Sequence, residues 1–283
     1  MRSLLLCVDG SRYTKICAKY AIELARLMDA YVDVLYVTNL NSAELSLIAD
    51  CGASLGVQPF HELSATLQGL EKKKFQRLER KVTRMFNNTK CDIKFKFNHR
   101  SGAVVDAFDE FKHDATGLDL VILGKRGESS GTAKEHLGSS LERILRTCSC
   151  PCFIAPDTFQ PSLKKILIAY DASDGINKAI QFVERNHFFK DCEIHLLTVD
   201  PTEDVRAQFS SAKSILCDVA KLNITAVERS GDTVDEIEKY VEEKHINLLV
   251  IGAYSHSIVR HFFVGSTTLE IIKQSTIPVV VFK

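Results

Sequence analysis

The stretch LLLCVDGS at residues 4–11 returns as ILIAYDAS at residues 166–173, and this repeat decides the fold. Asp9 and Val37 are 28 positions apart, and so are Asp171 and Val199. Matching segments in matching order predict that one domain has been duplicated within the chain. Four more pairs of similar segments follow in the same order: 32–40 with 192–201, 100–108 with 229–237, 118–124 with 246–252, and 138–155 with 265–282.

The two copies differ in length, mainly after the second repeated segment. Positions 37 and 100 are 63 apart, whereas the matching positions 199 and 229 are 30 apart, so the first copy holds about 33 extra residues. A short polar linker that contains two prolines separates the copies. We therefore expect a first domain over residues 1–157, with a helical insert at about 41–90, and a second domain over residues 164–283.

Each copy alternates apolar runs with amphipathic segments. Residues 15–28 carry apolar side chains at helical spacing, and residues 118–124 form a continuous apolar run of strand length. The segment CDIKFKF at 91–97 alternates apolar and polar residues, which is typical of an edge strand. Strands that alternate with helices predict the α/β class. We expect two doubly wound, Rossmann-like, five-stranded parallel sheets with flavodoxin-type strand order, helices on both faces and pseudo-twofold symmetry between them.

The loops after the fourth strands are the first place to look for a ligand. Doubly wound sheets bind ligands at the carboxyl ends of strands where the strand order reverses. The first copy reads GKRGESSGTAKEHLGSS at 124–140, and the second reads GAYSHSIVRHFFVGSTT at 252–268. Glycines permit close backbone approach, and a helix N-terminus attracts phosphate. Neither loop has the Walker A spacing or follows the first strand, as a dinucleotide fingerprint would.

These loops, together with an aspartate that ends each first strand, resemble those of the universal stress protein family. The family's mark is G-2x-G-9x-G-[ST] after the fourth strand, and the chain is similar to a tandem member over nearly its whole length. The resemblance implies an adenine nucleotide, ATP or AMP, in each competent domain. It also implies that the final strands of the two domains meet.

Transferred position by position, the resemblance implies one nucleotide-binding set in each copy. The aspartate and the valine would contact the base, the arginine the ribose or phosphate, and the glycines and hydroxyls the phosphates. In the first copy the set is Asp9, Val37, Gly124, Arg126, Gly127, Gly138, Ser139 and Ser140. In the second copy it is Asp171, Val199, Gly252, Arg260, Gly265, Ser266 and Thr267.

Both copies depart from the family pattern. The first has ten residues, not nine, between Gly127 and Gly138. The second keeps nine, but Ser255 replaces a glycine and Tyr254 takes the place of Arg126. Because loop length sets where the phosphate-binding amides lie, the spacing favours the second copy as the binder.

The resemblance implies a nucleotide-dependent switch of the stress response rather than a dedicated catalyst. We assign no catalytic residue and no resident metal ion, although Mg²⁺ could accompany ATP at Asp9 or Asp171. One alternative is a slow ATPase or phosphotransferase, which needs a positioned base and a charge clamp. Another is a scaffold whose loops have lost nucleotide binding. The chain could also form a homodimer.

The composition also bears on the partners and the location of the protein. The chain has 36 Lys+Arg and 36 Asp+Glu, and this net charge of zero argues against a nucleic-acid partner. No apolar run approaches the ~18–20 residues of a membrane span. Nine cysteines without an export signal favour reduced thiols, so we expect a cytoplasmic protein.

Two local features leave alternatives open. The segment at 71–86 is amphipathic, with seven Lys and Arg on one face, and it is either a solvated helix or a patch for a partner or nucleic acid. Cys148, Cys150 and Cys152 are either an ordinary buried strand entry or ligands for a soft metal.

Overall fold

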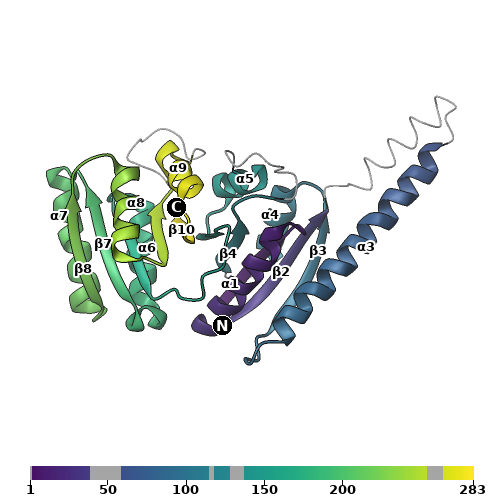
Figure 1. The fold of residues 1–283 in the computed structure, drawn as a ribbon, viewed down its shortest axis with the longest axis horizontal. Coiled ribbons are helices and arrows are strands. Elements are labelled where there is room, and N and C mark those ends of the chain that lie inside the picture. Colours follow the sequence, from purple (N-terminus) through teal and green to yellow (C-terminus); the bar gives the residue numbers. More distant parts are fainter. Residues whose placement is uncertain (1, 39–58, 115–117, 128–136, 254–263) are drawn as a thin grey trace.

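The computed structural model describes residues 2–38, 59–114, 118–127, 137–253 and 264–283. In this part of the chain all strands join one ten-stranded sheet, with helices packed on both faces (Figure 1). The strand order is β3-β2-β1-β4-β5-β10-β9-β6-β7-β8. The fold is therefore the α/β class expected from the alternating pattern.

Among the described residues, the strands and α-helices of the two halves correspond one to one. The first half contains β1 (Arg2–Val8), α1 (Arg12–Met28), β2 (Ala30–Thr38), α3 (Pro59–Asn87), β3 (Phe95–Ser101), α4 (Val104–Asp114), β4 (Leu118–Gly124), α5 (Ser139–Thr147) and β5 (Cys152–Ala155). The second half contains β6 (Lys165–Ala169), α6 (Asp174–Arg185), β7 (Glu193–Val199), α7 (Glu203–Ser214), β8 (Asn223–Arg229), α8 (Thr233–Lys244), β9 (Leu248–Gly252), α9 (Ser266–Gln274) and β10 (Val279–Phe282). Short turns of 3-10 helix (His187–Asp191) and π-helix (Ile215–Val219) follow α6 and α7.

Within each half the five strands are parallel and follow the order 3-2-1-4-5. This corrects one detail of the expected topology, because the flavodoxin order is 2-1-3-4-5. The third strand lies at the outer edge of the sheet, where one face of β3 meets solvent and its residues alternate in burial. The strand order therefore reverses between the first and fourth strands, which fixes the location of the ligand crevice.

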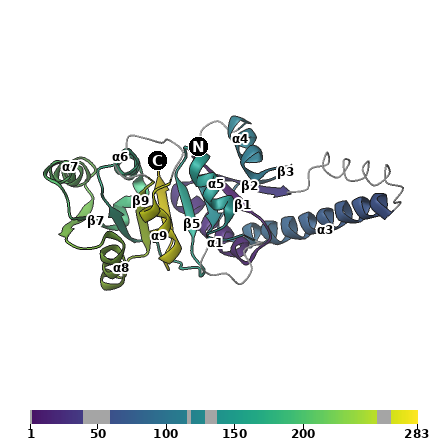
Figure 2. The ribbon, with the colours of Figure 1, turned by 90° about the horizontal axis from the view of Figure 1, so that it is seen from above.

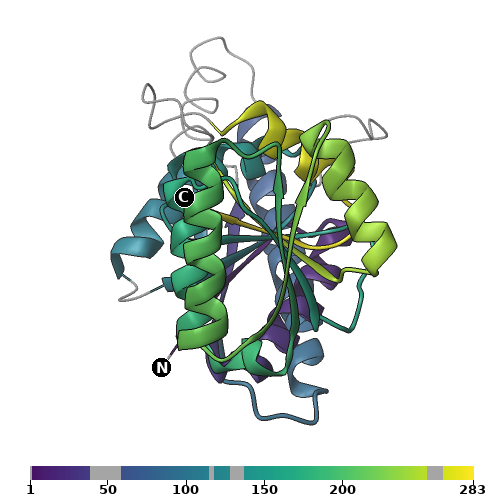
Figure 3. The same ribbon diagram turned by 90° about the vertical axis from the view of Figure 1, so that its left-hand side faces the viewer.

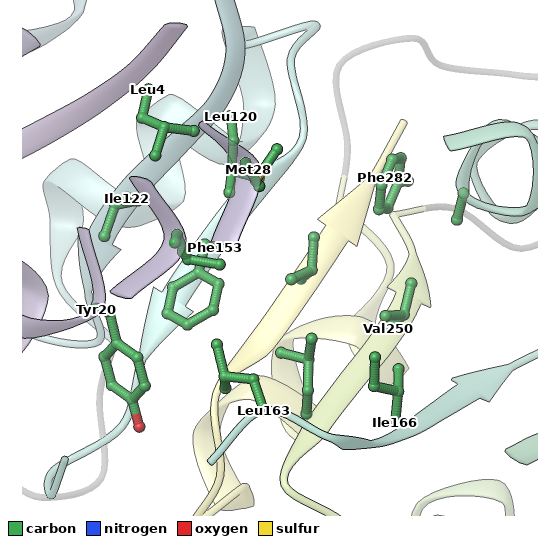
Figure 4. Packing of buried hydrophobic residues seen from close by; sticks show 14 of the residues in the cluster. Leu4, Tyr20, Met28, Leu120, Ile122, Phe153, Leu163, Ile166, Val250 and Phe282 are labelled. Atoms are coloured by element: carbon green, nitrogen blue, oxygen red, sulfur yellow. The ribbon is translucent and has the colours of Figure 1, made fainter. Parts of the chain in front are cut away.

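The two halves join through their final strands, as the resemblance implied. β5 and β10 pair antiparallel, with Val280 opposite Phe153. The expected pair of five-stranded sheets is therefore one continuous sheet. Figure 4 shows Phe153 and Phe282 packed on the same face as Leu4 and Ile166, which belong to different halves. Each face of the sheet thus carries one hydrophobic core that both halves share.

The helices that follow the first strands begin at equivalent serine caps. The Ser11 hydroxyl accepts a hydrogen bond from the Tyr13 amide, and the Ser173 hydroxyl accepts one from the Ile176 amide. Such caps satisfy amide groups that a helix start leaves without partners. In Figure 3 the green α7 and the yellow-green α8 lie on opposite sides of the strands, so both faces of the second half are covered.

The extra residues of the first half that the structure describes belong to the crossover between β2 and β3. α3 packs on β2 and β3 through Phe75, Phe97 and Tyr36, and α7 occupies the equivalent place in the second half. At 29 residues α3 is about 43 Å long, and it extends well beyond the sheet (Figure 2). Leu78, Val82 and Phe86 form its buried stripe, whereas Phe75 and Met85 are partly buried. The part of the expected insert at 41–58 lies outside the described residues.

No helix among the described residues is long and apolar enough to cross a membrane.

Candidate functional site

A cavity of about 570 Å³ opens at the carboxyl ends of β1 and β4 in the first half, and we call it crevice 1. It lies where the strand order reverses, and its volume is within the usual range for small-molecule sites. The structure brings together the entire set predicted for this half. Its lining includes Asp9, Val37, Gly124, Arg126, Gly127, Gly138, Ser139 and Ser140.

Three of these glycines lie where a side chain would meet close neighbours. A Cβ on Gly124 would lie 2.6 Å from the Cβ of Tyr13, and one on Gly127 would lie 3.0 Å from Oδ2 of Asp9. A Cβ on Gly138 would lie 3.2 Å from the Gly127 nitrogen. The Gly138 amide also donates to the Lys125 carbonyl at 3.1 Å, which holds the two described ends of the glycine loop together. A side chain at Gly124 would displace Tyr13, and one at Gly127 or Gly138 would force the neighbouring atoms to shift.

Asp9 orders the loop that follows β1. Its Oδ1 accepts hydrogen bonds from the Ser11 amide at 2.9 Å and the Thr14 hydroxyl at 3.4 Å. Between these residues Gly10 adopts φ +88°, a conformation that side chains disfavour. Oδ2 faces Gly127 across the crevice. One carboxylate therefore shapes the loop and also lines the cavity.

Arg126 is a nearly buried cation, 9% exposed, at the edge of crevice 1. Its Nη1 donates to the Tyr13 hydroxyl at 3.3 Å and lies 3.6 Å from Oδ1 of Asp157. Tyr13 and Arg12 both donate to the same carboxylate. Burial would raise the pKa of Asp157, but the Tyr13 hydrogen bond and the arginine charges lower it below its ordinary value. This network, which sequence reasoning missed, ties the linker to the site.

α5 begins directly at the cavity. Its N-cap is Gly138, which has no side chain to occupy the first amides of the helix, and Ser139 and Ser140 are exposed. The helix dipole favours an anion at this point. The N-terminus of α5 can therefore accept a phosphate group.

Crevice 2 is the equivalent cavity in the second half, at the ends of β6 and β9. Its volume is about 300 Å³, roughly half that of crevice 1. Ser266 begins α9 but is not part of the lining, and Arg260 lies outside the described residues, as do Tyr254 and Ser255. The predicted residues that line it are Asp171, Val199, Gly252, Gly265 and Thr267.

Local differences explain the smaller volume of crevice 2. α7 begins only a few residues after β7, so Pro201, Thr202 and Val205 form part of the wall. The Thr268 hydroxyl donates to the Gly252 carbonyl at 3.1 Å. Oδ1 of Asp171 accepts a hydrogen bond from the Ser173 amide at 3.0 Å, just as Oδ1 of Asp9 accepts one from the Ser11 amide. The two crevices therefore share the geometry of the aspartate loop but differ in the volume of the cavity beside it.

Lys125, a second residue that sequence reasoning missed, connects the glycine loop of the first half to the second half. It is 3% exposed, and its Nζ donates to the Ser275 carbonyl at 3.0 Å, just beyond α9. Burial and the neighbouring Arg126 lower the pKa of Lys125 to about 8. The sequence signal was only a charged residue between Gly124 and Arg126, which usually indicates an exposed loop.

The cysteine cluster lies at the entry to β5. Cys148 and Cys152 are buried, and the Cys150 amide donates to the Cys148 sulfur at 3.3 Å. A hydrogen bond with Cys150 lowers the pKa of Cys148, but contact with Cys152 and burial dominate and raise it to about 12. Protonated, buried thiols behave as small apolar side chains. In the described part of the chain no three His, Cys, Asp or Glu side chains converge as a metal site.

The amino-acid sequence is similar to those of known proteins. The model of the universal stress protein family matches residues 1–156 and 207–283. The universal stress protein Slr1230 of Synechocystis is 31% identical over 292 residues, which cover 100% of both chains. The universal stress protein MJ0531 of Methanocaldococcus jannaschii is 25% identical over 158 residues, or 54% of this chain and 81% of that protein.

Solved structures are similar in fold. A universal stress protein from Archaeoglobus fulgidus superposes with a TM-score of 0.67 at 21% identity, over 99% of this chain and 98% of that one. A putative universal stress protein from Pseudomonas aeruginosa gives 0.61 at 16% identity, over 99% and 92% of the chains. From the family match and the full-length similarity to Slr1230, the chain belongs to the universal stress protein family.

Proposed function

We propose that the chain is a regulatory protein of the stress response that binds an adenine nucleotide, ATP or AMP, in crevice 1. The observation that carries the proposal is the convergence of eight predicted residues, far apart in sequence, on one cavity of about 570 Å³. The close-packed glycines support it, because Gly124, Gly127 and Gly138 keep this part of the cavity wall free of side chains.

Different residues of crevice 1 would hold different parts of the nucleotide. Val37, at the end of β2, and Asp9 would hold the base, and the glycine cradle and the start of α5 would hold the phosphates. Arg126 adds a cation at the edge of the cavity. Asp9 is the one carboxylate among the described residues of the lining, so it is the group that would contact Mg²⁺ accompanying ATP.

We place nucleotide binding primarily in crevice 1, although loop spacing favoured the second half. Crevice 1 is the larger cavity, and it has a nearly buried arginine whose position is fixed by Tyr13 and Asp157. Crevice 2 keeps the aspartate loop and the start of α9, so we propose weaker binding there.

The proposed role is that of a switch rather than a catalyst. Oδ1 of Asp9 already accepts two hydrogen bonds, and the described lining offers no other carboxylate or histidine as a base. Bound and free forms would differ in conformation or in affinity for a partner, which is how a ligand controls a switch. We further propose that the protein acts in the cytoplasm, with the joined halves serving as an internal dimer.

Isothermal titration of the nucleotide-free chain tests the proposal. We expect micromolar binding of ATP or AMP, and at least 100-fold weaker binding by Gly127→Val, whose side chain would press on Asp9. Gly69→Ala is the matched control, because a Cβ there meets nothing within 4 Å. If neither nucleotide produced heat at millimolar concentration, the proposal would be wrong and the scaffold interpretation would be favoured.

A phosphate-release assay separates the switch from the enzyme. Turnover well below about 1 s⁻¹, the low end for kinases, is expected of a switch. Faster turnover that Gly127→Val abolishes would establish the slow ATPase instead.

A further inference from the structure

A basic groove runs along α3 on the far side of its buried stripe. The hollow has a volume of about 620 Å³. Lys15 comes from α1 and the other cations from α3, and all of them are exposed. We call this surface the α3 basic groove, and its six cations are Lys15, Lys73, Arg77, Arg80, Lys81 and Arg84.

The six cations of this groove lie close together, and the described residues offer them no acidic partner. Within the described residues none of the six forms an ion pair, and no carboxylate lines the groove. Some arginines elsewhere on the described surface do pair with glutamates. Arg206 contacts two glutamates, as does Arg229. Although the chain has zero net charge, the described lining of this groove concentrates positive charge without a carboxylate.

This arrangement opposes helix formation rather than supporting it. Lys73 and Arg77 are four residues apart, as are Arg77 and Lys81, and Arg80 and Arg84, and like charges at this spacing repel. α3 is held instead by Leu78, Val82 and other apolar side chains on its opposite face. Arg84 lies in the last turn of α3, where a cation is favourable, but the other cations add no stabilising pair to the described fold. An anion outside the chain would relieve their repulsion.

From this geometry, we propose that the α3 basic groove binds the phosphate backbone of a nucleic acid without reading its sequence. Three of the six cations are arginines, whose planar guanidinium groups match phosphate oxygens. The row from Lys73 to Arg84 spans eleven helical steps, about 16 Å, a length over which duplex DNA presents about ten charges. The described lining has no aromatic side chain on which bases could stack.

Other anionic partners fit the groove less well. A membrane-surface helix needs a free apolar face, and the apolar face of α3 beside the groove, from Phe75 to Phe86, is already packed against the sheet. The site is concave and elongated, whereas a bilayer is flat. The zero net charge, which argued against nucleic acid for the whole chain, does not oppose a local site, because fields are screened within about 8 Å at physiological salt.

Fluorescence anisotropy with a labelled 24-base-pair DNA duplex of mixed sequence tests the proposal on the full chain. Six phosphate contacts predict a slope of about −5 for log K against log salt, so affinity should fall about 10³-fold between 50 and 200 mM salt. A second duplex of unrelated sequence should bind equally well.

The triple variant Arg77→Gln, Arg80→Gln, Arg84→Gln removes three of the six contacts. Its slope should decrease to about −3, and the same rise in salt should weaken its binding only about 40-fold. The control, Lys178→Gln, Lys213→Gln, Lys221→Gln, removes three exposed charges from the second half and should keep the native slope. Thermal unfolding of both variants at or above the temperature of the native chain shows that the fold is intact.

Three results would overturn the proposal. The first is no anisotropy change at 50 mM salt with 100 µM protein. The second is an equal loss of slope in the control variant, which would make the effect one of net charge alone. The third is tighter binding to polyglutamate, or to vesicles containing phosphatidylserine, than to the duplex, which would assign the groove to an acidic protein or a lipid surface.

Discussion

Crevice 1 and crevice 2 are built from the same repeat, yet they differ about twofold in volume. Both place an aspartate at the end of the first strand, and both position it by a hydrogen bond from a serine amide. They differ in the connections: α7 closes on crevice 2 within a few residues of β7, whereas α3 begins 21 positions after β2 ends. Strands therefore define where a ligand can bind, and the connections define how much space it has.

The largest expected difference between the crevices is how much a bound nucleotide stabilises the folded chain. At 1,000 times the dissociation constant, a nucleotide raises the free energy of unfolding by about 4 kcal/mol. Gly138→Val should abolish this gain, because its side chain would press on the backbone of Gly127 and Arg126, which line crevice 1. The matched variant Gly265→Val lies in crevice 2 and should retain most of it. Urea unfolding with and without millimolar ATP measures both, and the reverse ranking would place the main site in crevice 2.

A second difference is the buried ammonium of Lys125, where the other half has Ala253. The pKa of Lys125 is about 8 in the fold, below the ordinary 10.5, so between these values the unfolded chain holds the extra proton. Stability therefore rises with pH in this window, by up to about 3 kcal/mol relative to Lys125→Met.

Urea unfolding of the native chain and Lys125→Met at several pH values between 8 and 10.5 checks this prediction. Lys164→Met, a change at an exposed lysine, is the control and should follow the native pH dependence. A constant difference between native and Lys125→Met across the window would show that Lys125 does not titrate there.

The smallest expected effect on stability comes from the residue that follows Asp9 or Asp171. Gly10 has φ +88° and Ala172 has φ +59°, so the second half holds a side chain in the left-handed region. Gly10→Ala should destabilise the chain by about 1 kcal/mol, and Ala172→Gly should change stability by less, toward a gain. Thermal unfolding of the two single variants measures this. Equal losses in both would mean that the two turns are not equivalent.

The sequence was sufficient for much of the fold, because its signals were local. Repeats, apolar periodicity and turn residues indicated the elements, and the resemblance indicated that β5 and β10 meet. The strand order was wrong in detail, although the alternation at 91–97 already marked an edge strand. Which strands become neighbours depends on how crossovers pack, and no single segment encodes that.

The site was predictable only for residues that belong to a motif. All eight residues of the first set line crevice 1, whereas the network of Tyr13, Arg126 and Asp157 was missed. Asp157 comes from the linker, and its contact with α1 exists only after the chain has folded back on itself. Lys125 was missed for the same reason, since its partner Ser275 is 150 positions away.

The antiparallel pairing of β5 with β10 has a consequence for how the two halves could evolve. An unpaired final strand would leave an open sheet edge, able to pair with any similar strand. Because the two halves share one chain, each meets its partner at an effective concentration near the millimolar range, whatever the protein concentration. Each half thus has one fixed partner, and a substitution on one side can be compensated on the other. The tether leaves the two crevices free to specialise separately, without risk of mismatched assembly.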